Sequence, residues 1–254
     1  HHILKHLSEE VKFKDVTEII CCLGLFGPKS RSMLEKISND DYSSENFKFG
    51  TCKNINIKNI KVWAQRISYV GELGFELYVE KENALELYKI LIEEGKNFNL
   101  SHCGMHAMDI MRMETGFLHW GHDISPEENQ YQSNLDFTIS FKKKVDFVGK
   151  EALKKIKEKK PDKKFSMFVL KNNEPGKPLI LHDEPIYLED KIIGRTTSGN
   201  YSFNYKKNLA FGYIENKFSE EELINKNLYI EIEKIKYPAN LLLKPLKDLN
   251  FKKL

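Results

Sequence analysis

The residues best suited to specific chemistry lie in one short segment, residues 66–76, which reads Arg-Ile-Ser-Tyr-Val-Gly-Glu-Leu-Gly-Phe-Glu. Gly71 and Gly74 flank Glu72, which predicts a tight connection. Glycine allows a positive φ and lets a ligand approach the backbone closely. A carboxylate held there can accept two parallel hydrogen bonds from a ring that presents an amino group beside a ring N–H, as a pterin or a guanine does. On spacing alone, the alternative is an ordinary turn glutamate that faces solvent.

Arginine is rare in this chain, although Lys and Arg together number 40. The four arginines are Arg31, Arg66, Arg112 and Arg195. A chain that otherwise uses lysine keeps arginine where a planar fork of donors is hard to replace by an ammonium. For Arg112 the alternative to a binding role is an ion pair with Asp109, which lies one turn earlier on the same expected helix.

The cysteines and histidines do not predict a metal site. The four cysteines are Cys21, Cys22, Cys52 and Cys103. Their spacing matches neither a zinc chelate nor a disulfide framework, so we expect reduced thiols in a cytosolic or organellar compartment. His102, Cys103 and His106 could touch a metal, but Gly104 interrupts any regular helix there.

Composition is that of an ordinary globular protein, with 41% hydrophobic and 30% charged residues over 254 positions. The net charge of +3 is too small to indicate a nucleic-acid partner or a membrane surface. No apolar run is long enough to span a bilayer, and no signal peptide is visible. We therefore expect a cytoplasmic protein, or one of the mitochondrial matrix in a eukaryote. The chain opens at His1 without Met, which suggests either a missing upstream part or a tag remnant.

Hydrophobic periodicity predicts an α+β region followed by a β region. In the first we expect strands over 12–27, 66–69, 75–79 and 135–141, a hairpin over 53–69, and helices from Ser30 and over 82–95 and 105–115. Residues 150–163 predict a short helix followed by a linker. In the second we expect short strands over 165–171, 185–189, 191–196, 208–214, 227–233 and 236–243. Their spacing favours a small barrel or sandwich. The boundary lies near 155–164, which gives domains 1–155 and 164–254.

Several blocks of the sequence resemble the glycine-cleavage aminomethyltransferase family. "RISYVGELGFELYV" resembles that family's "YTGE-x-G-x-E" segment. "DVTEIICCLGLFGPKSRSML", "GMHAMDIMRMETGFLHWGHDISPEEN", "DFVGKEAL" and "GRTTSGNYSFNYKKNLAFGYI" resemble further blocks in the family's order. "CLGLFGP" and "HWGHDISPE" are more similar to the dimethylglycine and sarcosine dehydrogenase branch than to the free glycine-cleavage protein.

The resemblance implies a fold and a set of residue roles. It implies a folate-binding body, incomplete at its N-terminus, followed by a C-terminal Greek-key β-barrel. Glu72 matches the family's pterin-holding glutamate, and Tyr69 matches the aromatic residue that lines the pterin pocket. Arg112 matches the arginine of the "RLE" helix, and Trp120 matches an aromatic position in the loop beside the folate.

Two departures from the family pattern limit what the resemblance implies. Ala107-Met108-Asp109 replaces the usual "ARD", so any folate-tail contact by that arginine is absent. The family's key aspartate near the folate N5 lies upstream of everything present here, so no residue of this chain takes its catalytic role.

The resemblance implies tetrahydrofolate-dependent one-carbon transfer in an N-demethylating enzyme. An N-methyl amine or an aminomethyl donor would be the small-molecule partner, and FAD is expected only in an upstream flavin domain. Two alternatives stay open: a stand-alone glycine-cleavage aminomethyltransferase, and a non-catalytic folate-binding subunit.

Overall fold

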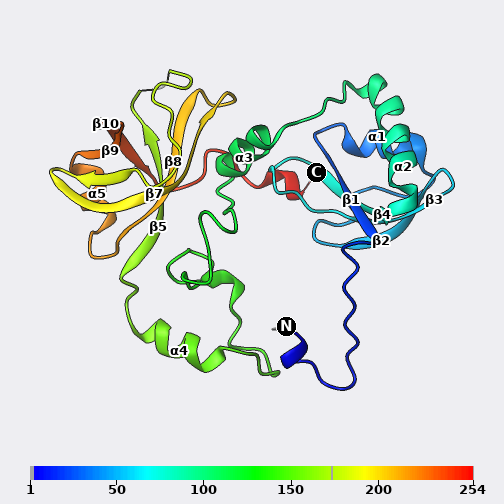
Figure 1. Ribbon diagram of the computed structural model, residues 1–254, viewed down its shortest axis with the longest axis horizontal. Coiled ribbons are helices and arrows are strands. Elements are labelled where there is room, and N and C mark those ends of the chain that lie inside the picture. The colour runs from blue at the N-terminus through cyan, green and yellow to red at the C-terminus, as the bar shows by residue number, and fades with distance from the viewer. Residues whose placement is uncertain (1–2, 173, 254) are drawn as a thin grey trace. The chain divides into compact units, whose positions relative to one another are not determined.

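The structure is a computed structural model that describes residues 3–172 and 174–253. The contacts within the chain divide it into two compact units (Figure 1). The first unit is His1–Cys103 together with Leu249–Leu254, and the second is Gly104–Asp248. His1 and His2, on which the suggestion of a tag remnant rests, lie outside the described residues.

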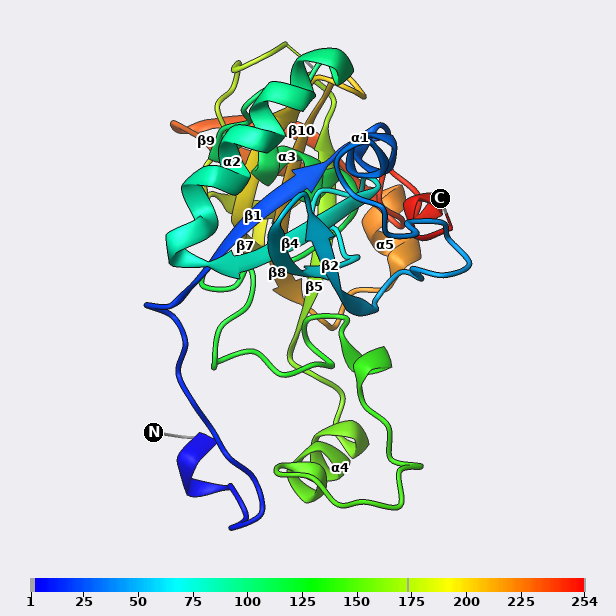
Figure 2. The same ribbon diagram turned by 90° about the vertical axis from the view of Figure 1, so that its right-hand side faces the viewer.

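The first unit is an antiparallel sheet with its two longest helices packed against it. Its strands are β1 (Ile20–Phe26), β2 (Cys52–Ile57), β3 (Ile60–Gln65) and β4 (Gly74–Glu80), in the order β1-β4-β3-β2. Its helices are η1 (Ile3–Lys5), α1 (Ser30–Ile37), α2 (Lys81–Gly95), η2 (Lys96–Phe98) and η4 (Asn250–Lys252). The helices α1 and α2 pack against each other and against the sheet (Figure 2).

Alternation along the strands explains which face of this sheet is covered. On β3, Ile60, Val62 and Ala64 are buried, and the residues between them point to the other face. Leu87 and Leu91, four residues apart on α2, belong to the same buried cluster. The helix α1 begins at Ser30, but the Ser30 hydroxyl does not cap it; it donates to the Leu73 carbonyl at 3.3 Å.

The second unit contains a closed six-stranded barrel. The strands are β5 (Lys163–Leu170), β6 (Pro185–Leu188), β7 (Lys191–Ser202), β8 (Lys207–Glu215), β9 (Leu228–Ile232) and β10 (Ile235–Leu242), in the order β10-β5-β8-β7-β6-β9. The helical elements are α3 (Met105–Glu114), η3 (Asp136–Thr138), α4 (Lys150–Glu158) and α5 (Glu220–Asn225). Phe168, Ile186, Ala210, Ile230 and others fill the barrel. The predicted α+β fold with a C-terminal β-barrel is confirmed.

Three predicted strands are wrong in whole or in part. Residues 12–19 are exposed coil, so the first strand is shorter than expected and begins at Ile20. Residues 66–69 bend towards the glycine turn and pair with none of the described strands. The stretch 135–141 holds only the short helix η3, and Phe137 is 80% exposed there, because no described strand lies beside it to pair with its backbone.

The division by contacts falls earlier than the boundary expected near residues 155–164. The reason is that α3 packs against β7 of the barrel, so residues 104–162 group with the barrel. The expected domains 1–155 and 164–254 therefore stay a prediction about where the chain can be separated.

Candidate functional site

Glu72 lies in a turn whose backbone is fixed from several sides. Gly71 has a φ of +68°, a conformation that a residue with a Cβ rarely adopts. A Cβ on Gly74 would come within 2.1 Å of the Phe26 ring. The amide of Glu72 donates to the Ser68 hydroxyl at 3.2 Å, and the Leu73 carbonyl accepts from the Gly27 amide at 2.8 Å. The two glycines are thus required by geometry, and the turn presents a half-buried Glu72 side chain.

The residues just before this turn support it. Tyr69 is half-buried, and Ser68 and Val70 on either side of it are buried. Arg66 is only 1% exposed, and its guanidinium donates to the Phe47 carbonyl. Burial, with the nearby Arg31 charge, lowers the pKa of Arg66. Arginine at position 66 is therefore a structural anchor of the segment that precedes Glu72.

Arg112 is buried in the second unit and all five of its N–H groups have protein acceptors. The Nε–H and one Nη2–H donate to Asp109 Oδ1 at 2.9 and 2.7 Å. The other Nη2–H donates to the Ser198 hydroxyl at 2.7 Å. The Nη1 group donates to the Phe117 carbonyl at 3.1 Å and to Asp123 Oδ2. The ion pair with Asp109 that the sequence allowed is present, and it is one part of a larger cluster.

Asp123 is the second centre of that cluster, and its side chain is 0% exposed. Its Oδ2 accepts from Arg112 and from the His119 amide at 2.9 Å. Its Oδ1 accepts from the Thr197 and Ser198 hydroxyls at 2.5 and 2.8 Å. Four hydrogen bonds satisfy the carboxylate and offset the cost of burying its charge. Asp123 thus joins the helix α3, the loop 117–124 and the strand β7.

Trp120 lies in this loop and is 66% exposed. The loop closes on itself through the Asp123 amide to the His119 carbonyl and the Gly121 amide to the Ile124 carbonyl, both at 2.8 Å. Gly121 has a φ of +89°, which again favours glycine. The loop thus holds the backbone at Trp120 and leaves the indole exposed, where a planar ring could stack on it.

Another buried carboxylate, that of Glu114 on α3, connects this helix to the end of β7. Glu114 is 1% exposed and accepts from the Ser202 hydroxyl at 2.6 Å and from the Asn204 amide at 2.9 Å. These bonds do not involve the loop 117–124. Glu114 and Asp123 therefore fix different parts of the unit.

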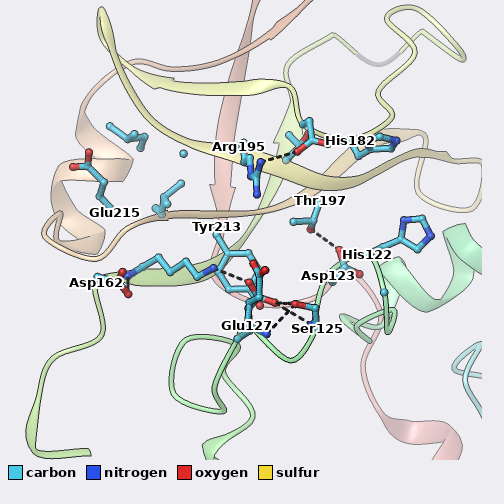
Figure 3. Close-up of a pocket in the computed structure, with 18 residues that line it drawn as sticks. His122, Asp123, Ser125, Glu127, Asp162, His182, Arg195, Thr197, Tyr213 and Glu215 are labelled. Atoms are coloured by element: carbon cyan, nitrogen blue, oxygen red, sulfur yellow. Dashed lines mark hydrogen bonds and ion pairs between the residues drawn. The ribbon is translucent and has the colours of Figure 1, made fainter. Parts of the chain in front are cut away.

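A cavity of about 870 Å³ opens beside Asp123 in the same unit, and Figure 3 shows the Thr197 hydroxyl bonded to Asp123 in its wall. Its charged groups are largely paired with each other: Arg195 lies 3.2 Å from Asp183, and Lys163 lies 2.6 Å from Glu128. Burial, with the charges of Glu128 and Asp123, raises the pKa of Tyr213, which keeps its hydroxyl protonated. Because these charges are paired with each other, the cavity wall suits a polar, uncharged ligand better than an ion.

The predicted site residues fall into two groups. Tyr69 and Glu72 lie three positions apart in the first unit. Arg112 and Trp120 lie in the second unit, where Asp123 connects the helix of the one to the loop of the other. Sequence reasoning missed Asp123, although a rare arginine followed by a loop that contains an aspartate was a usable signal.

The described residues offer groups for binding and orientation. They contain no group of three or more His, Cys, Asp or Glu side chains placed to hold a metal ion. Within the same residues, no helix is long and apolar enough to cross a membrane.

Comparisons with known families match the chain in two parts. Residues 1–143 match the family described as "GCVT N-terminal domain". Residues 163–248 match the "Glycine cleavage T-protein C-terminal barrel domain".

Among curated proteins, the chain is 33% identical over 252 residues to human "Dimethylglycine dehydrogenase, mitochondrial", which covers 96% of this chain and 28% of that protein. It is 32% identical to "Aminomethyltransferase" of Geobacillus sp. (strain WCH70), over 85% of this chain and 58% of that protein. The chain thus spans less than two thirds of each relative. In fold it resembles the crystal structure of glycine cleavage system aminomethyltransferase T from Bartonella henselae, with a TM-score of 0.75, 20% identity, and coverage of 90% of this chain and 60% of that one.

Proposed function

The chain belongs to the glycine cleavage T-protein (aminomethyltransferase) family, and on that premise we propose that it is the folate-binding part of an N-demethylating enzyme like dimethylglycine or sarcosine dehydrogenase. The observation that carries the proposal is the fixed turn that presents Glu72, in a segment that resembles the family's pterin-holding motif. The 33% identity to a dimethylglycine dehydrogenase over nearly the whole chain supports the choice of branch.

The residues of the turn fit a pterin. Glu72 carries a carboxylate on a turn in which Gly71 has a positive φ, and Tyr69 has a half-buried ring three residues earlier. A carboxylate can accept from the amino group and the adjacent ring N–H of a pterin in parallel. From the resemblance alone we also assign Trp120, in the second unit, to folate contact.

Tetrahydrofolate, when bound, supplies the nucleophilic nitrogen that accepts the one-carbon unit. The work of this chain is then to bind and orient the folate, since holding reactants in place accounts for much of the acceleration of such a transfer. The residue that acts at the reacting nitrogen, and the FAD that would oxidise the N-methyl amine, belong in our proposal to a longer protein of which this chain is part. A cytoplasmic location, or the mitochondrial matrix in a eukaryote, belongs to the same proposal.

The experiment is a calorimetric titration of tetrahydrofolate into the protein and into two variants. Glu72→Gln replaces one acceptor by a donor, and we expect it to cost about 1–3 kcal/mol of binding free energy. The matched control is Glu76→Gln, since Glu76 is also half-buried but lies on β4 and bonds to the Tyr78 hydroxyl. Equal affinities for native protein and Glu72→Gln would remove Glu72 from the site.

The stand-alone aminomethyltransferase is a second candidate, favoured by the 32% identity to the Geobacillus protein. Turnover distinguishes the candidates: the formation of 5,10-methylene-tetrahydrofolate is measured with dimethylglycine, with sarcosine, and with an aminomethyl-lipoyl carrier. Activity with the carrier alone would favour the transferase. Folate binding by the full-length protein without turnover of any donor would favour a non-catalytic binding subunit.

A further inference from the structure

Two buried charged groups, Arg112 and Asp123, form a fully hydrogen-bonded cluster that includes the loop of Trp120. We propose that Asp123 is a positioning residue for Trp120, and that Arg112 serves the site through Asp123 without touching the folate. The proposal rests on the proposed function in one respect, namely that Trp120 belongs to the folate site.

The first step is that Arg112 has no N–H group to offer a ligand. Its five N–H groups are shared among two carboxylates, one carbonyl and one hydroxyl. Its side chain is 1% exposed, so a ligand would have to displace protein acceptors from a buried charge. That exchange is costly, because an uncompensated carboxylate would stay behind.

The second step is that Asp123 is the group through which this charge reaches the loop. Its Oδ2 accepts from both Arg112 and the His119 amide, so one oxygen ties the guanidinium to the residue before Trp120. Its own amide donates back to the His119 carbonyl at 2.8 Å. The loop is therefore fixed at both sides of Trp120, at Asp123 and at His119.

The third step is that the barrel strand β7 holds Asp123 in turn. The Thr197 and Ser198 hydroxyls donate to its Oδ1, and these residues lie 74 and 75 positions away in sequence. A side chain that must be ordered on binding costs affinity, whereas one that is ordered beforehand does not. The cluster thus holds the backbone that carries Trp120 in place before any ligand arrives.

The experiment measures the mobility of Trp120 and the affinity for tetrahydrofolate in the same variants. The chain has two tryptophans, so in a Trp63→Phe background Trp120 is the only source of tryptophan fluorescence. In this background Asp123→Asn replaces one carboxylate oxygen by an NH₂ group, which cannot accept a hydrogen bond. The NH₂ group then faces either the two N–H donors at the Oδ2 position or the two hydroxyls at the Oδ1 position. We expect a lower Trp120 anisotropy and a loss of folate affinity of about three- to tenfold.

Two further variants keep the test decisive. Glu114→Gln is the matched control, because Glu114 is an equally buried carboxylate on α3 that does not bond to the loop. It should leave Trp120 anisotropy unchanged even if it lowers stability. Thr197→Val removes one hydroxyl with little change of shape, and should give a smaller effect of the same sign if Asp123→Asn does not fold.

The outcomes separate this proposal from the proposed function. Unchanged Trp120 anisotropy in Asp123→Asn, or in Thr197→Val where Asp123→Asn does not fold, would overturn the positioning role. An equal loss of anisotropy in Glu114→Gln would overturn it too, since the effect would then be general loosening. Unchanged folate affinity in Trp120→Ala would instead remove Trp120 from the folate site and leave the positioning role to be judged by anisotropy.

Discussion

Replacing Arg112 by Met should be among the most destabilising single changes in the second unit. Met keeps an unbranched stem but removes five hydrogen bonds and the positive charge. Asp123 is then left as a fully buried carboxylate with no counter-ion. Breaking one side of a buried ion pair costs about 3–5 kcal/mol, a large part of the stability of an ordinary domain.

The assay is urea denaturation of native protein, Arg112→Met, Arg112→Lys and Arg195→Met at one pH. Arg195 is the matched control, because its side chain is 72% exposed and pairs with Asp183 at the surface, where a pair contributes about 0–1 kcal/mol. Arg112→Lys should fall between the two, since one ammonium cannot reproduce the fork. A loss of unfolding free energy in Arg112→Met no larger than in Arg195→Met would refute the reasoning.

Two further predictions concern the segment before the barrel. Residues 134–160 contain no buried residue and nine lysines between 142 and 160, so trypsin should cut there first; first cuts within 190–215 would contradict this. The hydrogen bonds from Lys163 and Ser125 outweigh the effect of burial and lower the pKa of Glu128. The stability from Glu128 is therefore present above its unfolded pKa of about 4.3 and is lost as the pH falls through the lower folded value. Glu128→Gln should thus lose less unfolding free energy than native protein between pH 6 and pH 3. An equal loss would mean that the ion pair of Glu128 with Lys163 does not contribute to stability.

The sequence predicted the elements that have a clear period and a clear end. The helix over 82–95 has an apolar face and a glycine at its end, and α2 spans Lys81–Gly95. The hairpin expected over 53–69 is formed by β2 and β3, with Lys58 at a φ of +52° in its turn. Each of the six strands expected after residue 164 has a counterpart in the barrel.

The failures occur where a strand needs a partner that periodicity does not reveal. The stretch 135–141 is apolar enough for a strand, yet no described strand lies beside it, and Phe137 is exposed. The expected strand 66–69 is replaced by the approach to the Glu72 turn. There the buried Arg66 and the two glycines determine the path of the chain.

The candidate site shows a different limit of sequence reasoning. Arg112 and Asp123 lie in one block of the sequence and Ser198 lies in another, 86 positions after Arg112. In the fold they form one polar cluster, in which a buried guanidinium needs carboxylates and a buried carboxylate needs donors. The two blocks share these bonds, so a change of Arg112, Asp123 or Ser198 leaves a buried polar group of another one without a partner. Asp123 was predictable from this requirement, whereas its link to Trp120 depends on the path of a loop that only the structure shows.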